Sequence, residues 1–334
     1  MHTRRRFIRQ MATSAVGIAA TMKGIDAFAG ASNAVDQDGE YLSPNYQLRD
    51  REVVDYQFFE MQGISHIQFR GPAFDPDKTG NFFTCIGAAQ TMGVYVEKPF
   101  PTLLSEKFGM PAWNAGVGGA NPNFFLAHDK IIEIANKGRF VVLQMMTARS
   151  EPNARIATTK GVEMVRDLKQ GDIVRTPTLW GRIAKEEPAM MNKYIEQSRA
   201  SWVADYLTLL GKIKVPVILF WFSPKHMEDR LDIKSSGGAG LLDRYPQFVD
   251  GKLVEAIRPL GKAFVTCYSS RNLGHPLVSR FTGKQVEVDY ADLGPIATPL
   301  KESHNPYYPS PEMHQDAAAV LGPVIAKLGF AMKA

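Results

Sequence analysis

The chain has 334 residues, of which 45% are hydrophobic and 22% are charged, a composition typical of a folded globular protein. Its formal net charge is +5, but residues 1–29 hold five basic side chains and one acidic side chain, so residues 30–334 carry only +1. A nearly neutral main part lacks the positive surface that binds polyanions, which argues against DNA or RNA as a partner.

The N-terminus has the features of an export signal. Residues 3–9 read TRRRFIR, an apolar run of signal-peptide length extends from Met11 to Met22, and a small-x-small site follows at 27–29. This order resembles a twin-arginine signal peptide, with a second cleavage site at 32–34 as an alternative. We expect the twin-arginine machinery to export the chain to the periplasm. Residues 1–29 should be cleaved off in the process. No later apolar run is long enough to span a membrane.

Residues 30–60 are polar and rich in turn-forming residues, which predicts a leader that lies over the domain. The run from Ile64 to Phe69 alternates apolar and polar residues and ends at Gly71-Pro72, as a short edge strand does.

From residue 82 onward, compact apolar strands alternate with helical segments, which is typical of a parallel sheet with helices on both faces. The predicted strands are 82–86, 112–114, 140–146, 215–222 and 263–268, and the predicted helices include 101–108, 121–136 and 191–213. Ser310 and Pro311 begin a last helix, which we expect to pack on the first strand. We predict an α/β domain over residues 61–334, a three-layer sandwich of flavodoxin-like type with about five parallel strands.

Two insertions interrupt this alternation. Residues 151–190 mix charged residues with glycine and proline, and we expect a cap beside the ends of the third and fourth strands. Residues 228–250 are glycine-rich and suit a lid, a binding loop or a disordered excursion.

The cysteines and histidines limit the redox and metal chemistry. Cys85 and Cys267 lie in apolar runs, so we expect two buried thiols, with one bridge between them as the alternative. The histidines are scattered without metal-ligand spacing, and the glycines at 116–119 lack the third glycine of a dinucleotide fingerprint. We therefore expect neither a metal nor a cofactor.

Two blocks resemble the SGNH (GDSL-type) hydrolases. Residues 87–91 read GAAQT where that family has Gly-Asp-Ser-x-Thr after its first strand, and residues 114–120 read NAGVGGA, similar to its second block. The resemblance implies an esterase scaffold in which the N–H of Gly118 or Gly119 would bind the oxyanion. A plain strand-to-helix turn is the alternative reading. Ala89 stands at the serine position, so it offers no oxygen for nucleophilic attack.

The other two blocks of that family are also altered. Residues 144–150, QMMTARS, replace Gly-x-Asn-Asp, and residues 305–310, NPYYPS, replace Asp-x-x-His-Pro-Ser. Tyr308 then stands at the histidine position, and a phenol with a pKa near 10 is not a general base at neutral pH. Arg149 has the geometry to clamp an anion, or it pairs at the surface with a neighbour such as Glu151. Ser150 and His314 remain as catalytic candidates.

Together with residues 70–72, 99–101 and 308–314, these blocks resemble a bacterial SGNH-like family of unknown function. The sequence predicts binding of a carbohydrate or anionic small molecule rather than Ser-His ester hydrolysis. An esterase or acyltransferase acting on envelope polysaccharide, or a structural envelope protein that binds a partner, are the alternatives. The candidate ligand-binding residues are Gln90, Asn114, Gly118, Gly119, Arg149, Ser150, Asn153, Tyr308 and His314.

Overall fold

The computed structural model describes residues 46–229, 245–289, 301–305 and 307–330. The expected signal peptide, the first part of the leader and most of the 228–250 insertion lie outside these ranges. No helix within them has both the length and the apolar character that a membrane crossing requires.

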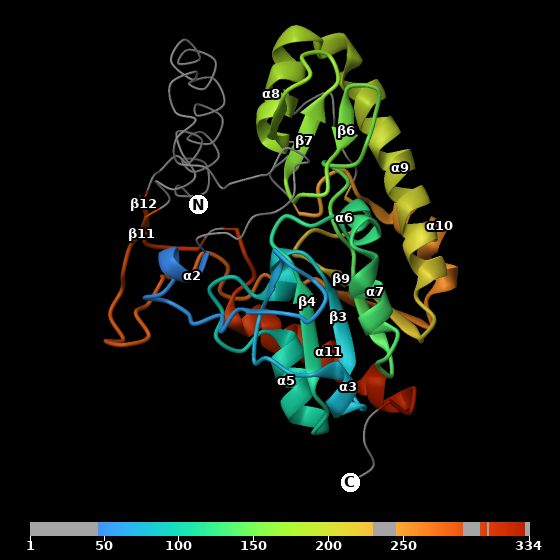
Figure 1. The fold of residues 1–334 in the computed structure, drawn as a ribbon. Coiled ribbons are helices and arrows are strands. Elements are labelled where there is room, and N and C mark those ends of the chain that lie inside the picture. The colour runs from blue at the N-terminus through green and yellow to red at the C-terminus, as the bar shows by residue number, and fades with distance from the viewer. Residues whose placement is uncertain (1–45, 230–244, 290–300, 306, 331–334) are drawn as a thin grey trace.

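Five parallel strands form the central sheet, in the order β10-β9-β5-β3-β4 (Figure 1). Counted along the chain from the β4 edge, this order is 2-1-3-4-5, which is the flavodoxin-like arrangement. The strands β3, β5 and β9 are buried at every residue, which explains why they read as continuous apolar runs. The predicted fold class is therefore confirmed. The strands are β3 (Phe83–Gly87), β4 (Ala112–Gly116), β5 (Val141–Gln144), β9 (Val217–Phe222) and β10 (Ala263–Cys267).

Helices cover both faces of this sheet and complete three layers (Figure 1). One face packs on α5 (Phe100–Phe108) and α11 (Pro311–Lys327). The other face packs on α6 (Pro122–Ala127), α7 (Asp129–Ala135), α9 (Met191–Lys212) and α10 (Gly251–Ile257).

Two helical predictions need correction. The single helix expected over 121–136 is broken at His128, whose backbone leaves the helical region with φ −122° and ψ 62°. The last helix, α11, packs mainly on α5 and β10, and it shares a core with Phe83 and Cys85 of the first central strand rather than resting on that strand alone.

The segment before the sheet is built from short elements. The expected edge strand at 64–69 shrinks to β2 (Gln68–Phe69), which pairs antiparallel with β1 (Phe59–Glu60). This segment also contains α2 (Tyr46–Arg49) and α3 (Pro76–Thr79). The short elements later in the chain are α4 (Ala89–Met92), η2 (Pro188–Met190), η4 (Arg258–Leu260), β11 (Val288–Asp289) and β12 (Lys301–Glu302).

The first insertion folds into a small subdomain, which we call the cap. It contains an antiparallel sheet of β6 (Ile156–Thr158), β7 (Met164–Asp167) and β8 (Ile173–Arg175), followed by α8 (Thr176–Glu186). The cap contacts the segment that follows β5, because the Trp180 indole donates to the carbonyl oxygen of Arg149 at 2.8 Å. It stands at one end of the sheet in Figure 1.

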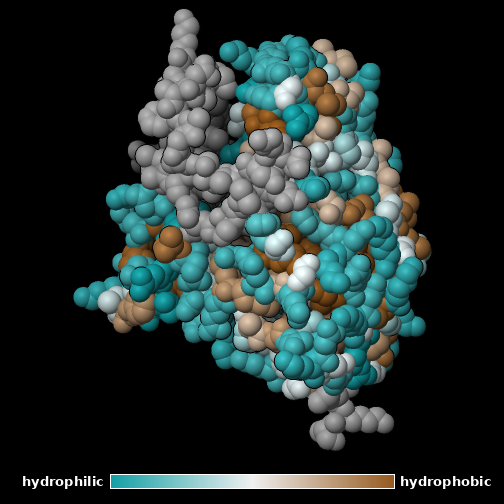
Figure 2. All heavy atoms as spheres, viewed as in Figure 1, coloured by the Kyte–Doolittle hydropathy of each residue, from teal (hydrophilic) through white to brown (hydrophobic). Residues whose placement is uncertain are grey.

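Polar residues dominate the visible surface (Figure 2), whereas most large apolar residues are buried. Figure 2 shows a face dominated by hydrophilic residues, with apolar residues in small separate groups. Cys85 and Cys267 are both buried and unpaired, which confirms the expectation of two free thiols.

Candidate functional site

The residue at the hydrolase serine position, Ala89, is packed away from solvent. It is 6% exposed and belongs to an apolar cluster with residues before the sheet, such as Tyr56, and residues of the C-terminal loops, such as Leu277 and Val288. A side chain here contacts hydrocarbon, so this position offers no catalytic group.

The loop after β3 is held by Gln144 at the end of β5. The Gln144 amide oxygen accepts from the Ala88 N–H at 3.1 Å and from the Thr91 hydroxyl at 2.6 Å. The Gln144 amide nitrogen donates to the Tyr245 hydroxyl at 3.1 Å. A Cβ on Gly87 would lie 2.4 Å from the Gln144 amide oxygen, so this contact requires glycine. Sequence reasoning placed Gln144 in the third block but missed this role, because hydrogen bonds between distant segments leave no periodic signal.

Two of the predicted ligand residues near this loop, Asn114 and Gln90, are buried. The Asn114 amide nitrogen donates to the Thr91 carbonyl oxygen at 3.0 Å, and its amide oxygen accepts from the Gly116 N–H at 3.1 Å. Asn114 therefore fixes the backbone. Gln90 is 3% exposed, and its buried amide oxygen has no hydrogen-bond partner among the described atoms.

His314 belongs to α11, and its ring lies in the core against Phe100 of α5. It is fully buried, its Nδ1 accepts from the Phe100 N–H at 3.1 Å, and its ring packs against Phe100 and Phe222. Burial, with a smaller contribution from Arg70, lowers the pKa of His314 to about 3, so the ring is neutral.

Ser150 and Asn153 hydrogen bond to other polar side chains. The Ser150 hydroxyl lies 3.2 Å from the Thr176 hydroxyl, and the Asn153 amide donates to the Ser198 hydroxyl at 2.9 Å. Neither bond involves a histidine, so neither is the nucleophile and base pair that ester hydrolysis needs.

Arg149 does come together with other charged residues, and its partner is Glu163 of the cap rather than the neighbouring Glu151. Arg149 forms an ion pair with one oxygen of the Glu163 carboxylate. Arg175 binds the other oxygen at 3.1 Å. Burial opposes the charge of Glu163, but Arg149 and Arg175 overcome it and lower the pKa of this carboxyl. The carboxyl of Glu163 is therefore ionised at neutral pH, and two guanidinium groups around one carboxylate leave a net charge of one positive unit.

The two glycines predicted as oxyanion donors make room for this arrangement. Gly119 has φ +82°, and a Cβ there would lie 2.4 Å from Cγ of Glu163. A Cβ on Gly118 would lie 2.8 Å from the hydroxyl of Tyr46. Side chains larger than hydrogen would therefore push Tyr46 or Glu163 out of place.

Three tyrosines lie near the charged trio. The Tyr46 hydroxyl lies against Gly118, next to the glycine on which Glu163 packs. Burial lowers the pKa of Arg149, whereas Glu163 and then Tyr307 and Tyr308 raise it. Burial raises the pKa of Tyr308 well above 10, so its hydroxyl stays protonated. We call Arg149, Glu163, Arg175, Tyr46, Tyr307 and Tyr308 the strand-end cluster. Its charged side chains are 12 to 26% exposed, so solvent reaches them.

Glu151 occupies a different environment from the surface position that its possible pairing with Arg149 implied. It is fully buried, and neither carboxyl oxygen has a hydrogen bond of normal geometry to a described residue. Burial and then the nearby Asp205 raise its pKa well above the usual value, so the carboxyl favours its neutral form.

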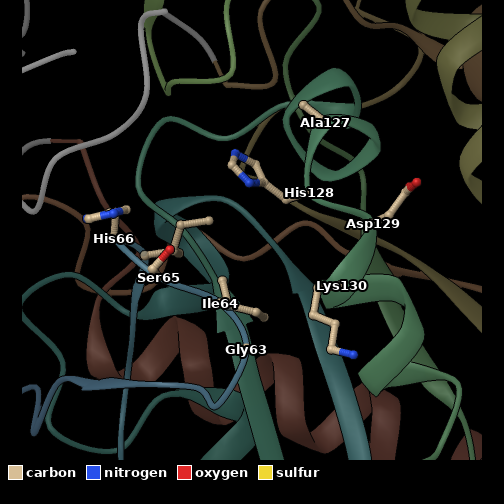
Figure 3. Close-up of a pocket in the computed structure, with 9 residues that line it drawn as sticks. Gly63, Ile64, Ser65, His66, Ala127, His128, Asp129 and Lys130 are labelled. Carbon is tan, nitrogen blue, oxygen red and sulfur yellow. The ribbon is translucent and has the colours of Figure 1, made fainter.

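A separate surface pocket of about 260 Å³ lies between the loop before β2 and the junction of α6 and α7 (Figure 3). It is lined by residues 63–67 and 127–130 and includes none of the strand-end cluster. Figure 3 shows Asp129 turned away from His128, consistent with its 2.7 Å ion pair to Lys212. Within the described ranges, no three histidine, cysteine or acidic residues are grouped to hold a metal ion.

The model of the family named domain of unknown function (DUF6473) matches residues 45–155 and 171–329. The chain belongs to this family. The unmatched residues between the two segments include Glu163. No curated protein matches the sequence.

Among solved structures, the chain is distantly similar to SGNH-type esterases. A catalytic mutant of the acetylxylan esterase Axe2 from Geobacillus stearothermophilus is 14% identical, with 77% of this chain and 98% of that chain covered and a TM-score of 0.37. Phospholipase A1 from Streptomyces albidoflavus NA297 is 9% identical over 73% and 99%, with a TM-score of 0.42. A candidate SGNH hydrolase from Slackia heliotrinireducens is 13% identical over 74% and 99%, with a TM-score of 0.32.

Proposed function

We propose that this DUF6473 protein binds an anionic small molecule, with an acidic carbohydrate as the leading class, at the strand-end cluster. The observation that carries the proposal is the convergence of Arg149 and Arg175 on a single carboxylate. A guanidinium matches the planar shape of a carboxylate and binds it through two donors. The surrounding tyrosines add flat apolar faces and hydroxyl groups, which suit a sugar ring.

The position of the cluster supports this function. Ligands of open α/β sheets bind beyond the carboxyl ends of the strands, near the point where the strand order reverses. Here that point lies between β3 and β5, and Arg149 follows β5. Gln144, at the end of β5, hydrogen bonds to Ala88 after β3 and to Tyr245, so it holds these strand ends in place.

The same residues argue against Ser-His ester hydrolysis. Ala89 has no nucleophilic atom, Tyr308 is protonated, and His314 is enclosed in the core. An esterase or acyltransferase with an unconventional site, and a structural envelope protein, remain the competing proposals. Cleavage of p-nitrophenyl acetate or labelling by a fluorophosphonate would support the first, and a stoichiometric envelope partner in a pull-down would support the second.

Calorimetric titration of the mature protein with glucuronate and galacturonate oligosaccharides tests the proposal. We expect Arg149→Gln to weaken binding at least about tenfold, because a charge-assisted hydrogen bond contributes about 1.5 to 3 kcal/mol. Arg166→Gln is the matched control, because Arg166 is an exposed arginine of the cap that bonds to the Gly171 carbonyl oxygen, outside the cluster. Equal losses in the two variants, or no loss in Arg149→Gln, would contradict the proposal.

We further propose that residues 1–29 direct the chain to the periplasm through the twin-arginine machinery, on the strength of the TRRRFIR run and the apolar stretch after it. Changing Arg4 and Arg5 together to lysine should leave uncleaved protein in the cytoplasmic fraction. Unchanged periplasmic delivery of the double variant would exclude this route.

A further inference from the structure

We propose that the charged group of the ligand is a carboxylate and that the Glu163 carboxylate occupies the position of that group in the unliganded protein. The ligand would bind by displacing the Glu163 carboxylate from Arg149 and Arg175. This inference rests on the proposed function, and it adds the chemical class of the ligand group and a built-in competitor for the site.

The geometry at Glu163 is that of a two-point carboxylate site. Each oxygen of the carboxylate faces a different guanidinium, one from Arg149 and one from Arg175. In both arginines, Nε is buried and has no hydrogen-bond partner among the described atoms, so each guanidinium has a donor to spare. Two cations around one carboxylate also leave a positive excess that attracts a further anion.

Glu163 is held in this position by features that do not depend on its charge. Its φ is +56°, a left-handed conformation that costs about 1 kcal/mol or more in a residue other than glycine. The Thr176 N–H and hydroxyl donate to the Glu163 carbonyl oxygen at 2.8 and 3.1 Å. The backbone is therefore anchored, and rotation of the side chain alone is enough to withdraw the carboxylate from the site.

The Glu163 side chain is 24% exposed, so part of it already meets solvent, and the rotation would turn the carboxylate toward water. Cγ of Glu163 packs against Gly119, and this contact leaves no room for a Cβ on residue 119. A tethered carboxylate competes at a high effective concentration, so removing it should tighten the binding of a free carboxylate.

Two variants remove the competitor by different means. Glu163→Gln deletes the charge, and Gly119→Ala places a methyl group 2.4 Å from Cγ of Glu163 and forces the side chain away. In calorimetric titrations of the mature protein with glucuronate, we expect both to bind at least about tenfold more tightly than wild type. Glu186→Gln is the matched control, because Glu186 pairs with Arg155 and Lys169 elsewhere in the cap. Its affinity should equal that of wild type.

Thermal unfolding gives a second readout that does not depend on high affinity. Without Glu163 the two guanidiniums lack their shared counter-charge, so Glu163→Gln should melt at a lower temperature than wild type. Added glucuronate or acetate should restore its Tm, because an anion that binds only the folded state stabilises it by mass action. Sodium chloride at equal ionic strength should not, and neither wild type nor Glu186→Gln should respond as strongly.

The outcomes separate this inference from the proposed function. If Arg149→Gln abolishes glucuronate binding but Glu163→Gln binds no more tightly than wild type, Glu163 is not a competitor and only the further inference fails. If phosphate restores the Tm as well as carboxylates do, the carboxylate class is wrong. If no variant binds glucuronate and no anion restores Glu163→Gln, the proposed function fails as well.

Discussion

At the scale of single residues, Glu151 is the clearest case of a carboxyl whose ionisation opposes folding. Its folded pKa is raised above the usual 4.5 by burial and then by Asp205. Such a group contributes stability that is complete below about pH 4.5 and is lost as the pH rises through the folded pKa. We expect Glu151→Gln to match wild type near pH 4 and to exceed it at pH 8, by about 1 to 3 kcal/mol, the cost of an unsatisfied buried group.

Urea unfolding of wild type and Glu151→Gln between pH 4 and pH 8.5 checks this prediction. Glu106→Gln is a suitable control, because Glu106 is half exposed and pairs with Lys98 at the surface, where ion pairs contribute little. A difference between wild type and Glu151→Gln that stays constant over the pH range would show that Glu151 does not titrate as expected.

Ala89 tests whether a hydroxyl alone revives hydrolysis. Ala89→Ser restores the residue type of the hydrolase block, but its hydroxyl would lie within the apolar cluster around Tyr56 and Leu277. We expect no hydrolysis of p-nitrophenyl acetate above the wild-type level and no fluorophosphonate labelling, because Tyr308 stands at the position of the base and His314 is enclosed in the core. Burial of the hydroxyl should cost about 1 to 3 kcal/mol in urea unfolding. A burst of nitrophenol from the variant would mean that a base lies within reach after all.

At the scale of elements, the docking of α11 depends on a neutral histidine. The pKa of His314 is lowered from 6.5 to about 3, so its contribution to stability is present above about pH 6.5 and is lost as the pH falls. Between pH 8 and pH 5 this loss amounts to about 2 kcal/mol. His314→Asn keeps an acceptor for the Phe100 N–H but does not titrate, so its stability should fall by about 2 kcal/mol less over that range. Equal falls in urea unfolding would place His314 in contact with water.

The elements show which predictions local sequence supports. Apolar runs predicted β3, β5 and β9 because both faces of these strands are buried, and Ser310 with Pro311 marked the start of α11. The break at His128 was missed because apolar residues continue on both sides of it, so the helical spacing carries no sign of an interruption. Hydrophobic periodicity reports burial along a face and says little about a single non-helical residue.

The candidate site was predicted less completely than the sheet, for a related reason. Arg149 was recognised from its place after a predicted strand, but Glu163 and Arg175 were not. Arg175 is the last residue of β8 and Glu163 directly precedes β7, and the pairing of Met164 with Arg175 brings both side chains to Arg149. Register in short, half-exposed strands is weakly encoded, so a sequence pattern cannot place those side chains. The burial of His314 in the core was not predicted, because the position of a residue in a helix does not by itself reveal which layer its side chain faces.

At the scale of the whole molecule, strand order determines the chemistry of the two thiols. Cys85 on β3 and Cys267 on β10 belong to the same core, but β5 and β9 lie between their strands. Three strand spacings amount to roughly 14 Å, whereas a disulfide needs Cα atoms within about 7 Å. Export into an oxidising compartment would therefore not link them while the sheet is intact. Burial also raises the pKa of both thiols and suppresses the reactive thiolate.

We expect Ellman's reagent to react slowly with the native protein and to detect two thiols after denaturation. We also expect dithiothreitol to leave the Tm unchanged. Rapid native labelling, or a Tm that drops on reduction, would mean that the sheet opens between β3 and β10.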